Sequence, residues 1–107
     1  MKVRNIDMAM FWNNVDVIRR KKLPLMLSFA LKCNRDEFAR IVPAYQEALA
    51  KANKEGEEAT QEFLKQEINV NIQTVSKSIL EKMDSDSRFD ALTGIEYAII
   101  DFMIDKE

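Results

Sequence analysis

Histidine is absent from this chain of 107 residues, and cysteine occurs once, at Cys33. Histidine is the usual general base near neutral pH, the partner of serine and cysteine nucleophiles, and the commonest zinc ligand. Its absence excludes most hydrolase mechanisms, so we expect no catalytic residue, no metal and no cofactor. A single cysteine cannot close a disulfide within the chain, and nothing here requires an oxidising compartment. We therefore expect a buried structural thiol at Cys33 and a cytoplasmic location.

Glycine is scarce, and no apolar run is long. Two distant glycines, Gly56 and Gly94, cannot form a glycine-rich phosphate loop, which excludes nucleotide sites of the P-loop and dinucleotide-fold kinds. The apolar stretch at residues 23–33 is far shorter than the roughly 20 residues of a membrane-spanning helix. It also begins too late, after Asp7 and Asp16, for a signal peptide. The sequence thus predicts no membrane segment.

The acidic stretch DSDSRFD, which begins at Asp84, has a spacing of carboxylates similar to that of a calcium loop. Arg88 stands where a third oxygen ligand is needed, the central glycine is missing, and Ile95 occupies the position of the closing glutamate. This stretch therefore predicts an acidic turn between helices, without a metal.

The charges are divided unevenly along the chain. Residues 1–53 contain ten Lys/Arg and five Asp/Glu, whereas residues 54–107 contain six and thirteen, so that the net charges of +5 and −7 give the total of −2. One interpretation is that the two halves pack side by side or between subunits, with most charges in solvent. The other is that one half recruits an oppositely charged partner.

Apolar residues at helical spacing predict most of the secondary structure. We expect helices at residues 7–20, with Asp7 as N-cap, and at residues 25–54, with a kink or break before Pro43 and an end at Gly56. The stretch 53–62 is predicted to be an exposed turn before a short helix around Phe63 and Leu64. Two capping boxes, Ser78 with Glu81 and Thr93 with Glu96, predict the last two helices.

One strand is predicted at INVNIQTV, residues 68–75, where Ile68, Val70 and Ile72 alternate with polar residues. A strand needs a partner for its backbone groups, and the partner is either residues 1–6 or the same strand of another subunit. The fold class is therefore α+β and mainly helical, with four to six helices and one short two-stranded β ribbon in a single domain, residues 1–107.

Two helices have apolar residues on more than one face. The first helix is predicted to bury Met8, Phe11, Trp12, Val15 and Ile18 on one face. One small core covers only one face of such a helix, so we expect a homo-oligomer. The expected interface consists of the residues on the opposite faces of the first and last helices: Met10, Val17, Tyr97, Ile100 and Ile104.

Four adjacent basic residues, 19–22, close the first helix, where cations complement its unsatisfied carbonyls. A nucleic-acid surface would need more basic residues along one face, and the chain is acidic overall, so no nucleic acid is expected. The alternative is a site for a phosphate-bearing small molecule. The candidate ligand-binding residues are Trp12, Arg19, Arg20, Lys22, Arg40 and Tyr45.

The phrase KLPLMLSFALKCN, the helix through AYQEALAKANKE and the tail from INVNIQTV to IEYAIIDFMI together resemble a family of small uncharacterised proteins from phages and prophages of Gram-positive bacteria. The resemblance implies a non-enzymatic accessory protein that binds a host or phage protein through apolar helix faces. An alternative is an anti-defence protein that sequesters a signalling nucleotide at a subunit interface. A third is a nucleic-acid mimic that uses the acidic half.

Overall fold

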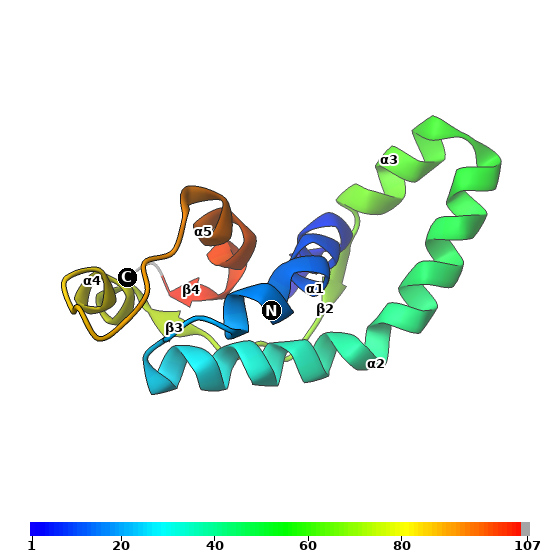
Figure 1. The fold of residues 1–107 in the computed structure, drawn as a ribbon. Helices are drawn as coiled ribbons and strands as arrows, with labels where there is room; N and C mark the ends of the chain where they lie inside the picture. The colour runs from blue at the N-terminus through cyan, green and yellow to red at the C-terminus, as the bar shows by residue number, and fades with distance from the viewer. Residues whose placement is uncertain (106–107) are drawn as a thin grey trace.

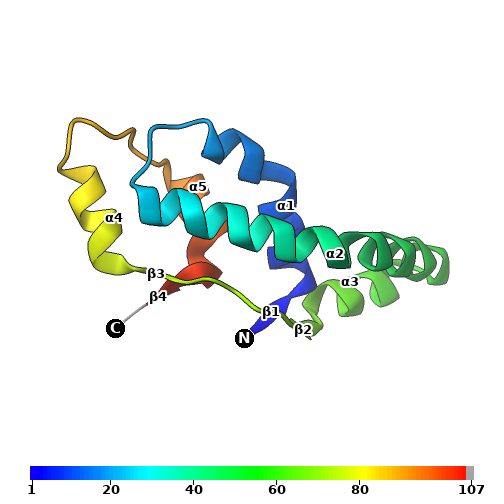
Figure 2. The same cartoon turned by 90° about the horizontal axis from the view of Figure 1, so that it is seen from below.

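In the computed structural model, which describes residues 1–105, five α-helices and four short strands form a mainly helical α+β structure, as predicted. Figures 1 and 2 show the long helix α2 running along one side of the molecule, with α1 packed along its first half and α5 packed against α1. The elements are, in chain order: β1 (Lys2–Arg4), α1 (Asn5–Arg19), α2 (Leu25–Glu55), α3 (Glu57–Lys65), β2 (Glu67–Asn69), β3 (Val75–Ser76), α4 (Lys77–Asp84), α5 (Gly94–Ile100), the 3₁₀ turn η1 (Asp101–Met103) and β4 (Ile104–Asp105).

The helix α1 begins two residues earlier than predicted. Its N-cap is Arg4, which makes no side-chain cap, so the prediction of Asp7 as N-cap is wrong. Asp7 lies instead in the first turn, where its carboxylate accepts a hydrogen bond from Arg4 Nε at 2.9 Å and complements the helix dipole. The predicted apolar face is confirmed: its members are buried except Trp12, which is partly exposed.

The helix α2 is one continuous element of 31 residues with Pro43 inside it. Figure 1 shows it bending in the blue-green part that contains this proline, so Pro43 kinks the helix and does not divide it. Gly56 ends α2 with a φ of 123°, a conformation that favours glycine. The prediction of an exposed turn over residues 53–62 is wrong, because the chain is helical on both sides of Gly56.

Beyond the kink, α2 and α3 form an arm that projects from the rest of the molecule (Figure 1). The Tyr45 and Phe63 rings stack between the two helices with their centroids 5.5 Å apart. The arm extends the molecule to 49 × 23 × 22 Å, and the radius of gyration is 15.1 Å. A compact domain of this length has a radius of gyration near 13 Å.

Two strand pairs tie distant parts of the chain together. β1 pairs with β2 in antiparallel orientation, with Val3 opposite Ile68, so residues 1–6 are the strand partner within the subunit. β2 ends at Asn69 and is shorter than predicted. β3 and β4 form a second, parallel pair with Val75 opposite Ile104, which the sequence pattern did not predict. This pair brings Ile104 and Asp105 back beside the start of α4 (Figure 2).

The core lies between α1, the first half of α2 and the C-terminal segment. Phe11, Phe38 and Phe102 meet at its centre, with ring centroids 5.3–5.8 Å apart, mostly in edge-to-face geometry. Ile100, an expected interface residue, is fully buried in this core. That expectation is wrong, because Ile100 packs into the core cluster together with Ile99 and Met103 of the same segment.

The two predicted capping boxes have different outcomes. The box at α5 is confirmed: Glu96 N donates to Thr93 Oγ1 at 3.1 Å, and Thr93 N donates to Glu96 Oε1 at 2.9 Å. The box at Ser78 is wrong, because α4 begins after Ser76 and has no side-chain cap. Among residues 1–105, no helix has the length and apolarity needed to cross a membrane.

Candidate functional site

A groove of about 370 Å³ lies between α4 and the segment from α5 to β4. We call it the acidic groove, because three of its lining residues are carboxylates and only one is a cation. Its residues are Lys77, Leu80, Glu81 and Asp84 of α4, Tyr97 of α5, Asp101 of η1 and Ile104 of β4. Cavities of this size with apolar walls and few polar groups are the usual form of a binding site.

The sequence of α4 builds one wall of the groove. Residues spaced by three and four positions share one helix face, which places Lys77, Leu80, Glu81 and Asp84 in one row. Leu80 is buried within this row and supplies apolar surface at its base. The opposite wall depends on the pairing of β3 with β4, which places Ile104 beside the start of α4.

The position of α5 depends on Lys21, at the end of α1. Lys21 Nζ donates to Glu96 Oε1 at 2.7 Å and to the Ala91 carbonyl at 3.1 Å. Both ion-pair side chains are largely shielded from solvent, so this contact is less screened than a surface pair. Two hydrogen bonds to its carboxylate hold the pKa of Glu96 below its usual range. The one from Lys21 has the largest effect, and the one from Thr93 N has the next largest. Lys21 therefore helps to fix the helix that presents Tyr97.

Tyr97 and Asp84 join the two walls across the groove. The Tyr97 hydroxyl donates to the Asp84 carboxylate, with oxygen–oxygen distances of 3.0 and 3.1 Å. Burial, together with this hydrogen bond and the adjacent negative charge, raises the pKa of Tyr97 to about 12. The phenol therefore remains protonated at neutral pH, and its hydrogen bond holds Asp84 in place as an acceptor.

The groove combines apolar surface with negative charge. Leu80 and Ile104 contribute aliphatic side chains and Tyr97 an aromatic ring, whereas Glu81 and Asp84 have exposed side chains at the rim. Such a surface favours an apolar side chain that is flanked by lysine or arginine, since the apolar part loses contact with water and the cations pair with the rim. Phosphate groups would be repelled by the same carboxylates.

The predicted ligand-binding residues do not converge. Trp12 and Tyr45 line the same small pocket of about 200 Å³ between α1 and α2, with mainly apolar neighbours. Arg40 lines a different pocket beside the loop at Asn71 and forms an ion pair with Glu37. Burial raises the pKa of Tyr45, whose ring is stacked on Phe63. Arg40 and the two aromatic members of the predicted site thus line different pockets.

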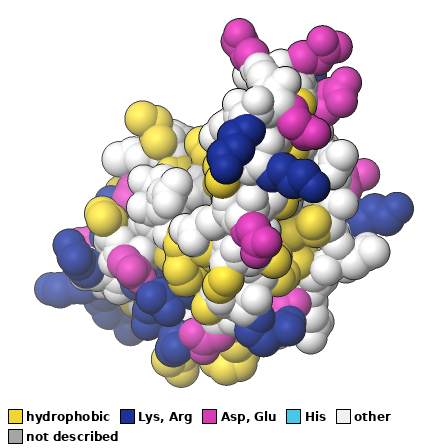
Figure 3. Space-filling view, turned by 90° about the vertical axis from the view of Figure 1, so that its right-hand side faces the viewer, with side chains coloured by type: hydrophobic (Ala, Val, Ile, Leu, Met, Phe, Trp, Pro, Cys, Tyr) yellow, Lys and Arg dark blue, Asp and Glu magenta, His cyan; other side chains and the backbone are white. Residues whose placement is uncertain are grey.

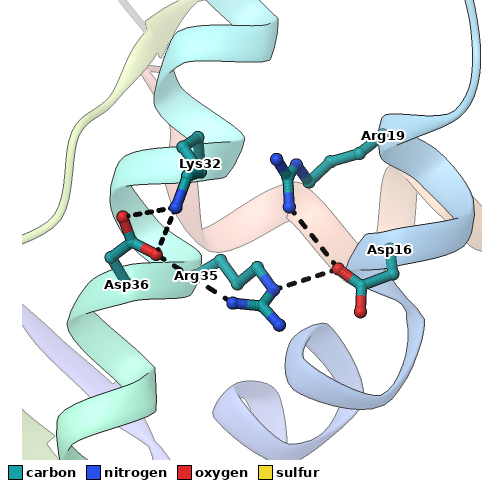
Figure 4. Close-up of polar contacts among 5 residues, drawn as sticks. All are labelled: Asp16, Arg19, Lys32, Arg35 and Asp36. Atoms are coloured by element: carbon teal, nitrogen blue, oxygen red, sulfur yellow. Dashed lines mark hydrogen bonds and ion pairs between the residues drawn. The ribbon is translucent and has the colours of Figure 1, made fainter.

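Arg19 belongs to a chain of ion pairs between α1 and α2 (Figure 4). Its guanidinium lies 3.6 Å from Asp16 Oδ1, which also accepts a hydrogen bond from Arg35 Nε at 3.0 Å. The Arg35 guanidinium lies 5.2 Å from the centre of the Trp12 ring. The cation beside Trp12 is therefore Arg35, which is not among the predicted ligand-binding residues. Asp36 continues the chain toward Lys32.

Arg20 and Lys22 lie at the end of α1. Arg20 is the C-cap of the helix, and its side chain is exposed. The backbone of Lys22 is bonded twice to Asp90: Lys22 N donates to Asp90 Oδ2 at 2.7 Å, and Asp90 N donates to the Lys22 carbonyl at 2.8 Å. These contacts fix the loop, whereas the Lys22 side chain extends into solvent.

The remaining expected interface residues divide into two groups. Met10 and Val17 are exposed on the outer face of α1, as predicted. Tyr97 and Ile104 are half-buried and line the acidic groove. Sequence reasoning missed the α4 wall, although its row of residues at helical spacing, from Lys77 to Asp84, was a usable signal. Cys33 is half-buried and lines the pocket that contains Arg40, so the prediction of a buried thiol is wrong.

Among residues 1–105, no group of three His, Cys, Asp or Glu side chains is arranged to hold a metal ion. Asp86, in the acidic turn, is bonded instead by the Arg88 guanidinium and backbone, which lower the pKa of this carboxyl to about 2. Comparison with protein-family models, curated proteins and solved structures finds no match for this chain.

Proposed function

We propose that this protein acts without catalysis, by binding a basic and apolar segment of a partner protein in the acidic groove. As the resemblance in its sequence implies, we place it among the small accessory proteins of phages and prophages of Gram-positive bacteria, where the partner is a host or phage protein. The acidic groove carries the proposal, because it joins buried apolar surface to three carboxylates in one cavity.

The energetics favour a segment that presents a Leu-like side chain between cations. Burying one such side chain contributes about 1.5–3 kcal/mol, which gives only weak binding by itself. Cations opposite Glu81 and Asp84 add specificity and accelerate association. The hydrogen bond between Tyr97 and Asp84 keeps the walls in place before the segment arrives, which lowers the cost of ordering.

No observation favours the alternative of a nucleotide-sequestering protein. Several of its candidate residues already have partners: Arg19 is paired with Asp16, Arg40 is paired with Glu37, and Trp12 already has a cation from Arg35. At Arg19 and Arg40, a phosphate group would have to displace these carboxylates before it could bind.

The test uses two peptide probes of the same length, one an amphipathic helix of leucine and lysine and the other its leucine–glutamate counterpart. We expect the lysine peptide to shift the amide NMR signals of α4 and α5 and the glutamate peptide to leave them unchanged. Reversing a charge at the rim, Glu81→Lys, should weaken binding of the lysine peptide about tenfold.

The matched control is Glu58→Lys, an exposed residue in the first turn of α3 at the tip of the arm. It makes the same change in net charge far along the molecule from the groove, so it should leave the affinity nearly unchanged. Equal weakening by both variants, or signal changes spread over the whole surface, would show non-specific attraction and overturn the proposal.

A further inference from the structure

The start of α2 presents an exposed apolar surface that we call the α2 patch, defined by Leu25, Met26 and Phe29. The exposed fractions of these residues are 83%, 51% and 53%. Leu25 and Phe29 are one helical turn apart and lie on the same side of the helix. Large exposed apolar side chains that are clustered in this way commonly mark a contact with another molecule.

The surroundings of the α2 patch are positively charged. Arg20 and Lys22 precede Leu25 by five and three positions in the sequence and have exposed side chains. The first turn of α2 contains no acidic residue, so nothing there compensates the positive end of the helix dipole. Lys82 and Arg88 line the shallow pocket next to Leu25 and Met26, together with one carboxylate, Asp86, which is paired with Arg88.

The α2 patch and the acidic groove lie on opposite sides of α4. Leu80, Glu81 and Asp84 line the groove, whereas Ile79, Lys82 and Met83 line the pocket beside the α2 patch. At 100° per residue, these two sets occupy opposite faces of the helix. One molecule therefore presents a basic apolar projection on one side and an acidic apolar cavity on the other.

We propose that the segment bound by the acidic groove is the α2 patch of a second copy of this chain, an inference that rests on the function proposed above. Leu25 would enter the groove, and Arg20 and Lys22 would face the carboxylates at its rim. Because the two surfaces differ and face away from each other, the contact is head-to-tail. Each added copy leaves one free patch and one free groove, so association continues to short chains or a closed ring.

The charge pattern favours a second copy of the chain, and not an anionic membrane, as the binding partner of the α2 patch. The acidic groove supplies both the apolar cavity and the negative charge that the α2 patch requires. An anionic membrane surface would attract the patch but repel the molecule as a whole, because the net charge of the chain is −2. Figure 3 shows acidic side chains gathered over the tip of the arm, where α2 ends and α3 begins.

The first experiment measures mass by light scattering as the concentration rises from about 10 μM to about 1 mM, the range expected for a small interface. The wild type should increase in mass. The patch variant Leu25→Ser/Phe29→Ser and the groove variant Glu81→Lys should each remain close to the monomer mass. Ile95→Ser and Glu58→Lys, at exposed sites outside both surfaces, are the matched controls and should associate as the wild type does.

The decisive measurement mixes the patch variant with the groove variant. Each retains one functional surface, so a head-to-tail contact gives a heterodimer of one copy of each and nothing larger. A symmetric contact, in which each copy must supply both surfaces, gives no such rescue and would overturn the proposal. Association of the wild type that neither variant reduces would also overturn it.

Two further outcomes separate this inference from the function proposed above. A wild type that stays monomeric but still binds the leucine–lysine peptide through Glu81 refutes the second copy and leaves the groove function standing. A wild type that neither associates nor binds the leucine–lysine peptide refutes both the second copy and the groove function. Sedimentation with vesicles of phosphatidylserine and phosphatidylcholine tests the membrane: vesicle binding that requires Leu25 and Phe29, without self-association, would overturn the proposal.

Discussion

The side chain of Asn34 and the backbone of Gln73 exchange two hydrogen bonds, although 39 residues separate them. Asn34 Nδ2 donates to the Gln73 carbonyl at 3.0 Å, and Gln73 N donates to Asn34 Oδ1 at 2.7 Å. The amide of Asn34 thus replaces a strand partner for the segment between β2 and β3, and it is fully buried in α2. Asn34 thereby helps to fix the path that leads the chain to α4 and the acidic groove, together with Glu37, whose Oε2 accepts a hydrogen bond from Asn71 N at 2.8 Å.

Asn34→Ala should lower the free energy of unfolding by about 1–3 kcal/mol, because two backbone groups of Gln73 lose their partners. The measurement is urea denaturation followed by circular dichroism. Asn13→Ala, at an exposed position on α1, is the control and should change stability by less than about 0.5 kcal/mol. Equal effects of the two substitutions would contradict the role assigned to Asn34.

The contact between Lys21 and Glu96 predicts a dependence of stability on pH. Its depressed pKa means that Glu96 stabilises the fold above the pKa of an unfolded glutamate, about 4.3, and that this contribution is lost as the pH falls through the folded value. Glu96→Gln keeps an oxygen for the Thr93 backbone but removes the charge. It should lower stability at pH 7 by about 1–2 kcal/mol.

The difference in stability between the wild type and Glu96→Gln should shrink as the pH is lowered below about 4.3, because the wild-type carboxyl is then protonated too. Thermal unfolding at a series of pH values measures it. Comparing the two proteins at each pH cancels the contributions of other carboxyls with lowered pKa values, such as Asp36 and Glu37. A difference that stays constant down to acidic pH would show that the Glu96 charge is irrelevant.

Pro43→Ala should raise the free energy of unfolding by about 1–3 kcal/mol. A proline inside a helix removes one backbone donor, so the carbonyl of Ala39 lacks its helical partner until alanine restores it. Pro24→Ala, at the N-cap of α2, removes a proline where no helical hydrogen bond is missing and serves as the control. Loss of stability in Pro43→Ala would indicate instead that the arm requires the kink, since Tyr45 must reach Phe63.

The sequence predicted those parts of the fold that depend on local patterns. The spacing of Met8, Phe11, Val15 and Ile18 determined which face of α1 is buried, and Thr93 with Glu96 determined where α5 begins. Gly56 determined the end of α2, because few other residues adopt its backbone angle. These features depend on residues within one or two helical turns of each other, so they can be predicted from the sequence.

The candidate site could be predicted only in part. The sequence pattern places Tyr97 and Ile104 on the second apolar face of the last helix. The groove that they share with Leu80 and Glu81, however, depends on the parallel pairing of β3 with β4. Two-residue strands leave almost no periodic signal in a sequence. The predicted cluster of cations and aromatic residues failed for a related reason: proximity along α1 placed Arg19 beside Asp16, whereas Arg35 reached Trp12 from another helix.

By itself, then, the sequence determined the order of the helices, the buried face of α1 and the exclusion of histidine-based chemistry. Tertiary structure alone decided that Ile100 is inside and Leu25 outside, although both are aliphatic residues in apolar surroundings of the sequence. The physical reason is that burial depends on which surfaces meet when helices pack. Contacts between residues far apart in the chain, such as Lys21 with Glu96 and Asn34 with Gln73, make that choice.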